Sequence, residues 1–224
     1  TAPASCRAGL LGLLQGLERA RLAARTESEG ERQSLERFRA ALGPAWEGRG
    51  SLDALCEREP RDGNRLREID ARSGASITSF GDNGRVDMRT GPVRPLGGPS
   101  ATPGRVFENL FLTGSQTGEG YGSTPGDLRA YDIVTGKLAW TFHTIPYPGE
   151  VGYDTWPESA WKWAGGVNTW GEISIDEKRG IAYFPLGSPT HDMFGGDRKG
   201  ANLFGNCLLA LDARTGKRLW HFQT

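Results

Sequence analysis

The sequence predicts an all-β fold, a partial β-propeller, preceded by a segment that is either helical or disordered. Three observations support this prediction: a hairpin-like motif occurs three times, Gly and Trp are abundant, and the composition changes near residue 63. The 224 residues include 33 Gly, 7 Trp and only 2 Met, as expected of a chain with many tight turns and large flat side chains. A chain of this length can bury a substantial core.

The first segment, residues 1–62, is rich in Arg, Glu, Leu and Ala and has a loose helical periodicity. That periodicity is not sustained in heptads, so it gives little support to a partner-binding amphipathic helix. We expect a polar helical extension or a disordered segment, of unknown role. Residues 63–224 are richer in Gly, Thr, aromatic and β-branched residues, and we expect the propeller there.

The repeated motif covers Leu66–Phe80, Leu128–Phe142 and Leu208–Phe222. In each copy an Asp is followed three residues later by Ser or Thr and then by Gly, and a Phe lies ten residues after the Asp. An Asp that accepts backbone N–H groups, followed by a Gly at positive φ, is typical of a tight turn between two strands. Each copy is therefore predicted to be one hairpin, and a feature present in every copy indicates scaffold instead of site.

Trp140 and Trp220 occupy matching positions on the predicted returning strands, whereas Ile77–Phe80 in the first copy lacks the Trp. We expect these two rings to pack between neighbouring sheets. The copies are spaced more widely than one short blade requires, which implies long loops within the blades. Loops on a rigid scaffold are where binding sites are usually built.

Several functions are disfavoured by the charge and motif patterns. Lys+Arg and Asp+Glu both number 27, so the net charge does not favour nucleic acid, and we expect a small-molecule partner. Gly118, Gly120 and Gly122 lack the spacing of a dinucleotide-binding loop. The 3 His and 3 Cys show no metal-ligand spacing. No secretory leader and no run of about 18 apolar residues is present, so we expect any signal or anchor to lie outside this sequence.

Four stretches accompany the hairpins: "ITSFGDNGRVDMR", "TGSQTGEGYGSTPGDLRAYD", "TWPESAWKWAGGVNTWGEISIDE" and "YFPLGSPTHDMFGGDR". With the hairpins, they resemble the dehydrogenases that depend on pyrroloquinoline quinone (PQQ), especially the membrane glucose dehydrogenase type, over nearly all of Asn64 to Thr224. The resemblance implies about three blades of an eight-bladed propeller. It further implies PQQ stacked on a Trp, a divalent cation beside the quinone, and an Asp acting as base.

The same resemblance assigns candidate cofactor ligands. The family's stacking Trp corresponds to Trp170 in "GGVNTWGEISID", where a flat indole under a planar quinone offers broad contact. The alternative is that Trp170 is another ring packed between blades. Ser115, Thr117 and Gly118 are expected to hydrogen-bond the carboxylates of the cofactor, or else to be plain turn residues.

Two residues correspond to the family's cation ligands. The first is Glu119, whose carboxylate suits calcium or magnesium, with a solvated loop glutamate as the alternative. The second is Thr190, because "PLGSPTHDMFGGDR" follows the glucose-type pattern, whereas the alcohol-type slot falls on Ser188.

The resemblance implies a periplasmic or periplasm-facing quinoprotein dehydrogenase that oxidises an aldose, polyol or other alcohol by hydride transfer to PQQ and passes electrons to a quinone or cytochrome. The catalytic Asp of relatives would follow Thr224, so no catalytic residue is assigned and the chain alone is expected to be inactive. The family's upstream basic residue has no assignable match. A non-enzymatic PQQ-repeat propeller that binds other proteins is the alternative, and a His/Trp/Asp loop straight after Thr224 would favour the enzyme. The oligomeric state and the exact substrate are not indicated.

Overall fold

The computed structural model describes residues 65–70, 74–89, 94, 96–97 and 104–224. The segment 1–62, for which we expected a helix or disorder, lies outside these residues. The chain divides into two compact units, one of residues 1–62 with 67–85 and one of residues 63–66 with 86–224. None of the helices in the described part is long and apolar enough to cross a membrane.

Two four-stranded sheets form the framework of the second unit. The first sheet consists of β3 (Arg105–Phe107), β4 (Leu110–Thr113), β5 (Leu128–Asp132) and β6 (Leu138–Phe142). The second consists of β7 (Ser174–Asp176), β8 (Ile181–Pro185), β9 (Cys207–Asp212) and β10 (Arg218–Gln223). A separate two-stranded sheet pairs β1 (Arg65–Arg67) with β2 (Arg85–Asp87).

Each four-stranded sheet is an antiparallel meander in which every strand pairs with the next one in sequence. This is the arrangement of a propeller blade. Leu128 and Ala130 of β5 and Leu209, Ala210 and Leu211 of β9 are fully buried, which places the core along these strands. The predicted all-β, partial-propeller fold is thereby confirmed.

The hairpins predicted from the repeat, β5–β6 and β9–β10, close with the same turn. Asp132 Oδ1 accepts hydrogen bonds from the N–H and the hydroxyl of Thr135, at 2.7 and 2.8 Å. Gly136 follows at a φ of 69°, a conformation that Gly adopts without steric cost. Asp212 and Gly216 reproduce this geometry in the second sheet. Both turns confirm the predicted roles of the Asp and the Gly.

The first copy of the motif has the same backbone hydrogen bond between its Asp and its Gly, in the other unit. The N–H of Gly74 donates to the carbonyl of Asp70 at 2.8 Å, and Gly74 also has a φ of 69°. Ile69 and Ser76 form an antiparallel bridge across the turn. The hairpin persists here without the Trp that the later copies carry.

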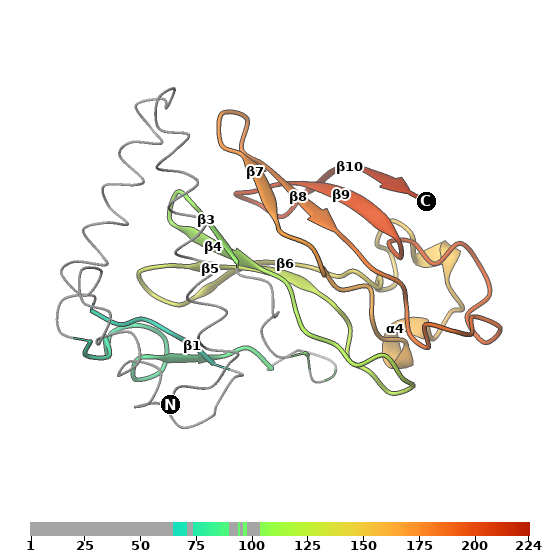
Figure 1. Cartoon of the computed structure of the whole chain (residues 1–224), viewed down its shortest axis with the longest axis horizontal. Coiled ribbons are helices and arrows are strands. Elements are labelled where there is room, and N and C mark those ends of the chain that lie inside the picture. The colour runs from blue at the N-terminus through green and yellow to red at the C-terminus, as the bar shows by residue number, and fades with distance from the viewer. Residues whose placement is uncertain (1–64, 71–73, 90–93, 95, 98–103) are drawn as a thin grey trace. The chain divides into compact units, whose positions relative to one another are not determined.

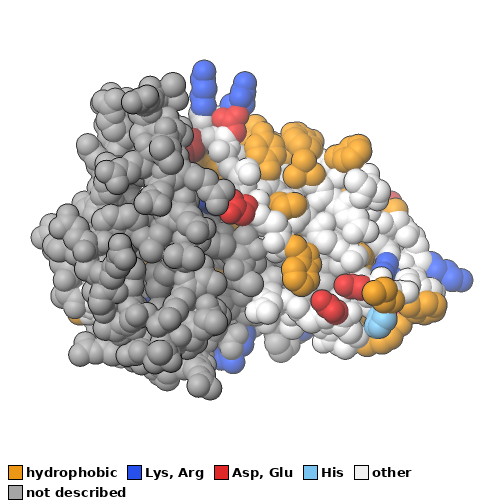
Figure 2. Space-filling view, in the orientation of Figure 1, with side chains coloured by type: hydrophobic (Ala, Val, Ile, Leu, Met, Phe, Trp, Pro, Cys, Tyr) orange, Lys and Arg blue, Asp and Glu red, His pale blue; other side chains and the backbone are white. Residues whose placement is uncertain are grey.

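The two matching Trp residues differ in their surroundings. Trp140 is 8% exposed and packs against the second sheet, as predicted. Trp220 is 42% exposed, and Leu219 and Phe222 beside it on β10 are exposed as well. Figure 2 shows hydrophobic side chains gathered on this part of the surface. Within the described residues, no sheet covers Trp220.

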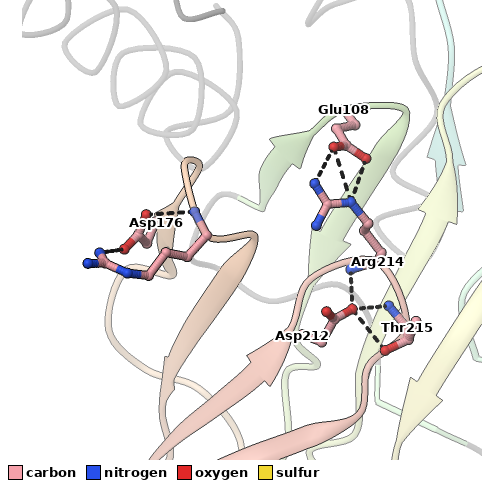
Figure 3. A network of polar contacts seen from close by, with 6 residues as sticks. Glu108, Asp176, Asp212, Arg214 and Thr215 are labelled. Atoms are coloured by element: carbon pink, nitrogen blue, oxygen red, sulfur yellow. Dashed lines mark hydrogen bonds and ion pairs between the residues drawn. The ribbon is translucent and has the colours of Figure 1, made fainter. Parts of the chain in front are cut away.

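Ion pairs and capping bonds reinforce the ends where the short turns lie (Figure 3). Arg214 in the β9–β10 turn binds the carboxylate of Glu108 in the β3–β4 turn, with Nη2 and Nε 2.5 and 3.1 Å from its oxygens. Asp176 accepts from the guanidinium of Arg179 at 2.7 Å within the β7–β8 turn. The Glu108–Arg214 pair therefore links the first sheet to the second.

Short turns and long loops are segregated at opposite ends of the sheets (Figure 1). This follows from the meander, because alternate connections lie at the same end. The long connections are residues 114–127, 143–173 and 186–206; η2 (Tyr153–Thr155) and α4 (Ala160–Trp163) belong to the second of them. All the candidate site residues lie in these three loops. The end of the two sheets that carries the three long loops is called the loop end.

Candidate functional site

Three loop segments meet at the loop end, with residues 164–170 in the middle. On one side, the N–H of Gly126 donates to the carbonyl of Gly166 at 2.7 Å. On the other side, the N–H of Val167 donates to the carbonyl of Ser188 at 2.9 Å, and that of Thr190 to Gly165 at 3.0 Å. The middle segment is therefore held by backbone hydrogen bonds to both neighbours.

Trp170 lies at the end of this middle segment, just before β7. It is 62% exposed, in contrast to the buried Trp140. Gly187, in the loop after β8, lies against the edge of the indole, where an added Cβ would come 2.7 Å from Cδ1 of Trp170. The ring thus has a packed edge and solvent-accessible surface, which suits a stacked planar ligand.

Glu119 and its neighbours lie in the loop between β4 and β5, which we call the acidic loop (residues 115–123). Gly118 and Glu119 are exposed. The hydroxyl of Thr117 donates to Oδ1 of Asn168 at 3.0 Å, which joins this loop to the Trp170 segment. The hydroxyl of Ser123 donates to the carbonyl of Gly120 at 2.5 Å and closes the loop on itself. The Glu119 carboxylate is therefore presented to solvent on a loop that is tied down on both sides.

Ser115 is fully buried at the base of the acidic loop. Its hydroxyl donates to the carbonyl of Asp127 at 2.9 Å and accepts from Nη2 of Arg129 at 2.7 Å. Both hydrogen-bonding capacities of the hydroxyl are thus used by the protein. Ser115 supports the loop at this position.

Thr190 is buried beside the middle segment and belongs to the loop after β8. The next residue, His191, stacks on Tyr121 of the acidic loop with ring centroids 5.3 Å apart. The structure therefore brings together the three segments that carry Glu119, Trp170 and Thr190, through direct contacts between their neighbours.

The oxygen donors of Glu119 and Thr190 are of the kind that calcium and magnesium prefer. Among the described residues there is no group of three or more His, Cys, Asp or Glu side chains that could hold a metal ion by itself. A cation at this end would therefore need further oxygen ligands, such as those of a bound cofactor. Hard oxygen chemistry fits the predicted cation, and an exposed indole fits the predicted quinone.

An acid–base cluster next to Ser115 was not predicted from the sequence. Asp127 is almost completely buried and accepts the N–H of Thr144 at 3.1 Å. Burial raises the pKa of the Asp127 carboxyl to about 6. Nearby, Nδ1 of His143 lies 2.8 Å from a carboxylate oxygen of Glu150. Burial lowers the pKa of His143, but the hydrogen bond to Glu150 and the charge of Asp127 outweigh it, so that the pKa is raised.

There is a physical reason why the sequence does not predict this cluster. Asp127 directly precedes the repeated hairpin, and His143 and Glu150 follow it in "HTIPYPGE", so none of them belongs to a recognisable spacing. The one sequence feature that could have indicated the cluster is the single carboxylate of Asp127, directly before a predicted strand. Only the packing of residues 143–150 near Asp127 shows that these groups interact.

Two adjacent four-stranded antiparallel blades define part of a β-propeller. At their loop end, the segment that carries the exposed Trp170 lies between the loop of Glu119 and the loop of Thr190. Comparison with known proteins agrees. A family model described as "Glucose/ethanol/alcohol dehydrogenase, beta-propeller domain", of the PQQ family, matches residues 45–224.

The similar proteins are quinoprotein dehydrogenases. The chain is 34% identical over 183 residues to quinoprotein glucose dehydrogenase A of Acinetobacter calcoaceticus, covering 78% of this chain and 22% of that protein. It is 32% identical over 167 residues to quinate/shikimate dehydrogenase (quinone) of Acinetobacter baylyi, covering 71% and 20%. A quinohemoprotein alcohol dehydrogenase structure from Pseudomonas putida aligns with a TM-score of 0.56 and 28% identity, over 72% and 24% of the two chains.

The chain belongs to the PQQ family of dehydrogenase β-propeller domains, as its loops and hairpins had indicated. It spans about a fifth of the length of these curated relatives.

Proposed function

We propose that this chain supplies cofactor and cation ligands to a PQQ-dependent dehydrogenase that oxidises an aldose, a polyol or another alcohol. Family membership supports this proposal, as do relatives named for glucose, quinate/shikimate and alcohol substrates. The single observation that carries it is the exposed Trp170, which ends a segment that is hydrogen-bonded to the acidic loop on one side and to the loop of Thr190 on the other.

Each candidate residue has a role that suits its position. Trp170 would form the stacking surface under PQQ, and Gly118 and Thr117 would line its edge. Glu119 and Thr190 would contribute oxygen ligands to calcium or magnesium. Ser115, whose hydroxyl is already engaged at 2.9 Å with the Asp127 carbonyl, would act by fixing the loop.

When bound, PQQ supplies the two-electron acceptor for the hydride that leaves the substrate carbon. The contribution of this chain is to orient the ring on Trp170 and to place a cation through Glu119. Relatives are named for a quinone and for cytochrome c as acceptors. We propose a quinone as the acceptor here, reached from a periplasm-facing position.

The stacking role is tested by titrating PQQ, with calcium present, against the protein that carries this sequence and against two Trp variants. Trp170→Ala is expected to weaken PQQ binding by about tenfold or more, since base-like stacking on an aromatic ring contributes on the order of 1–3 kcal/mol. Trp140→Ala is the matched control. It removes the same side chain from a buried inter-sheet position, and should lower the melting temperature while leaving PQQ affinity nearly unchanged.

Unchanged PQQ affinity in the Trp170 variant would contradict the stacking role. A folded wild-type protein that binds no PQQ at any calcium concentration would favour the non-enzymatic propeller scaffold.

A further inference from the structure

The acidic loop and the Trp170 segment are joined by one side-chain hydrogen bond. The hydroxyl of Thr117 donates to Oδ1 of Asn168 at 3.0 Å. Thr117 lies two residues before Glu119, and Asn168 lies two residues before Trp170. A single bond therefore sits between the residue proposed to bind the cation and the residue proposed to stack the quinone.

The Asn168 side of this bond is rigidly held. The carbonyl of Asn168 accepts the N–H of Gly187 at 2.9 Å. Its backbone packs directly against Gly126, where an added Cβ would come 2.3 Å from Cα of Asn168. Asn168 itself is almost completely buried. The acceptor oxygen thus has little freedom to follow Thr117 if the acidic loop moves.

The strained backbone next to Asn168 also indicates that this position is fixed by its surroundings. Val167 has a φ of +56°, which is a rare and sterically unfavourable conformation for a β-branched residue. Its N–H is held by Ser188 at 2.9 Å. Such conformations persist where surrounding contacts over-determine them, and they are concentrated at ligand sites.

We propose that Asn168 is a positioning residue, which acts through Thr117 to hold the Glu119 loop at a set separation from Trp170. The inference rests on the proposed function and deepens it. If the two ligands share one rigid frame, then cation binding at Glu119 and quinone binding on Trp170 should strengthen each other. Releasing the Thr117–Asn168 bond should reduce this mutual strengthening more than either separate affinity.

The test measures the dissociation constant of PQQ with and without calcium chloride, in the protein that carries this sequence. The calcium enhancement is the ratio of the two constants. Thr117→Val removes the donor at nearly constant shape and is expected to reduce the enhancement about three- to tenfold, the range for one neutral hydrogen bond. Thr117→Ser keeps the hydroxyl and should stay within about twofold of wild type.

A double-mutant cycle tests whether Asn168 is the partner. If the bond carries the effect, Thr117→Val combined with Asn168→Ala should reduce the enhancement no further than the larger single effect. Thr135→Val is the matched control, because the Thr135 hydroxyl makes a similar 2.8 Å bond to Asp132 in the β5–β6 turn. It should lower the melting temperature without changing the enhancement.

If Thr117→Val kept the calcium enhancement of the wild type, the positioning role would be overturned. The same would follow if the effects of Thr117→Val and Asn168→Ala on the enhancement were fully additive. The proposed function fails separately. If the wild type binds PQQ and Trp170→Ala weakens that binding while Thr117→Val changes nothing, only the positioning role is lost. If the folded wild type binds no PQQ, both proposals fall.

Discussion

The indole Nε1 of Trp140, on the last strand of the first sheet, donates a 3.1 Å hydrogen bond to the carbonyl of Ala213 in the β9–β10 turn of the second sheet. Gly216 lies under the same ring, where an added Cβ would come 2.6 Å from its carbons. The repeated hairpin thereby packs one blade on the next. The Trp on one returning strand meets the turn of the following hairpin.

Trp140→Ala should destabilise this chain by about 3–5 kcal/mol, because it empties a buried aromatic site and orphans the Ala213 carbonyl. Trp220→Ala should cost less than half as much, because that ring is already 42% exposed. Urea denaturation followed by circular dichroism measures both values. Equal losses in the two variants would show that the inter-sheet contact of Trp140 adds nothing.

Asp127 should make stability depend on pH. Burial raises the pKa of its carboxyl from 3.8 to about 6, so its neutral form is favoured in the folded state. The protonated carboxyl therefore contributes fully to the free energy of unfolding below about pH 3.8, and this contribution is lost as the pH rises through about 6. The loss in the free energy of unfolding amounts to about 3 kcal/mol. Asp127→Asn keeps an oxygen that can accept the Thr144 N–H, and it should flatten the stability profile across that window.

The control for this profile is Asp176, which has the opposite sign. Its hydrogen bonds from the Arg179 side chain hold the pKa of Asp176 below its usual value. Asp176→Asn should therefore remove stability that the wild type has above the ordinary Asp pKa and loses as the pH falls. Chemical denaturation at half-unit pH steps separates the two variants. If Asp127→Asn kept the stability–pH profile of the wild type, the proposed effect of burial on the Asp127 carboxyl would be refuted.

Glu108→Gln should change stability by less than about 1 kcal/mol, although Glu108 accepts three hydrogen bonds from Arg214. Both side chains are about half exposed, so solvent and salt screen the pair. Thermal denaturation at low and at 1 M salt provides the measurement. A loss that is large and independent of salt would indicate that this pair locks the two sheets together.

Glu119→Gln should reduce the calcium enhancement of PQQ binding by about tenfold or more, because it removes the charged ligand while keeping the shape. Glu158, another exposed glutamate at the loop end, offers the matched control. Glu158→Gln should leave the enhancement unchanged. Calcium titrations monitored through PQQ affinity compare the two, and an equal response of both variants would remove Glu119 from the cation site.

The hairpins could be predicted from the sequence because their geometry is local. Asp132, Thr135 and Gly136 interact within four residues of one another, so their spacing alone specifies the turn. The same spacing recurs at Asp212, which made the blade architecture predictable as well. Trp170 and Glu119 could be proposed as site residues because their loops resemble those of a known family.

Contacts between loops were decided by the tertiary structure alone. Thr117 and Asn168 are 51 residues apart, and no spacing rule connects them. The 2.8 Å contact of His143 with Glu150 likewise forms only when the loop after β6 folds back on itself. Local hydrogen bonds depend on nearby residue types, whereas these contacts depend on how two blades and three loops pack together. The sequence by itself therefore determined the hairpin scaffold, and the tertiary structure decided how the site is held on it.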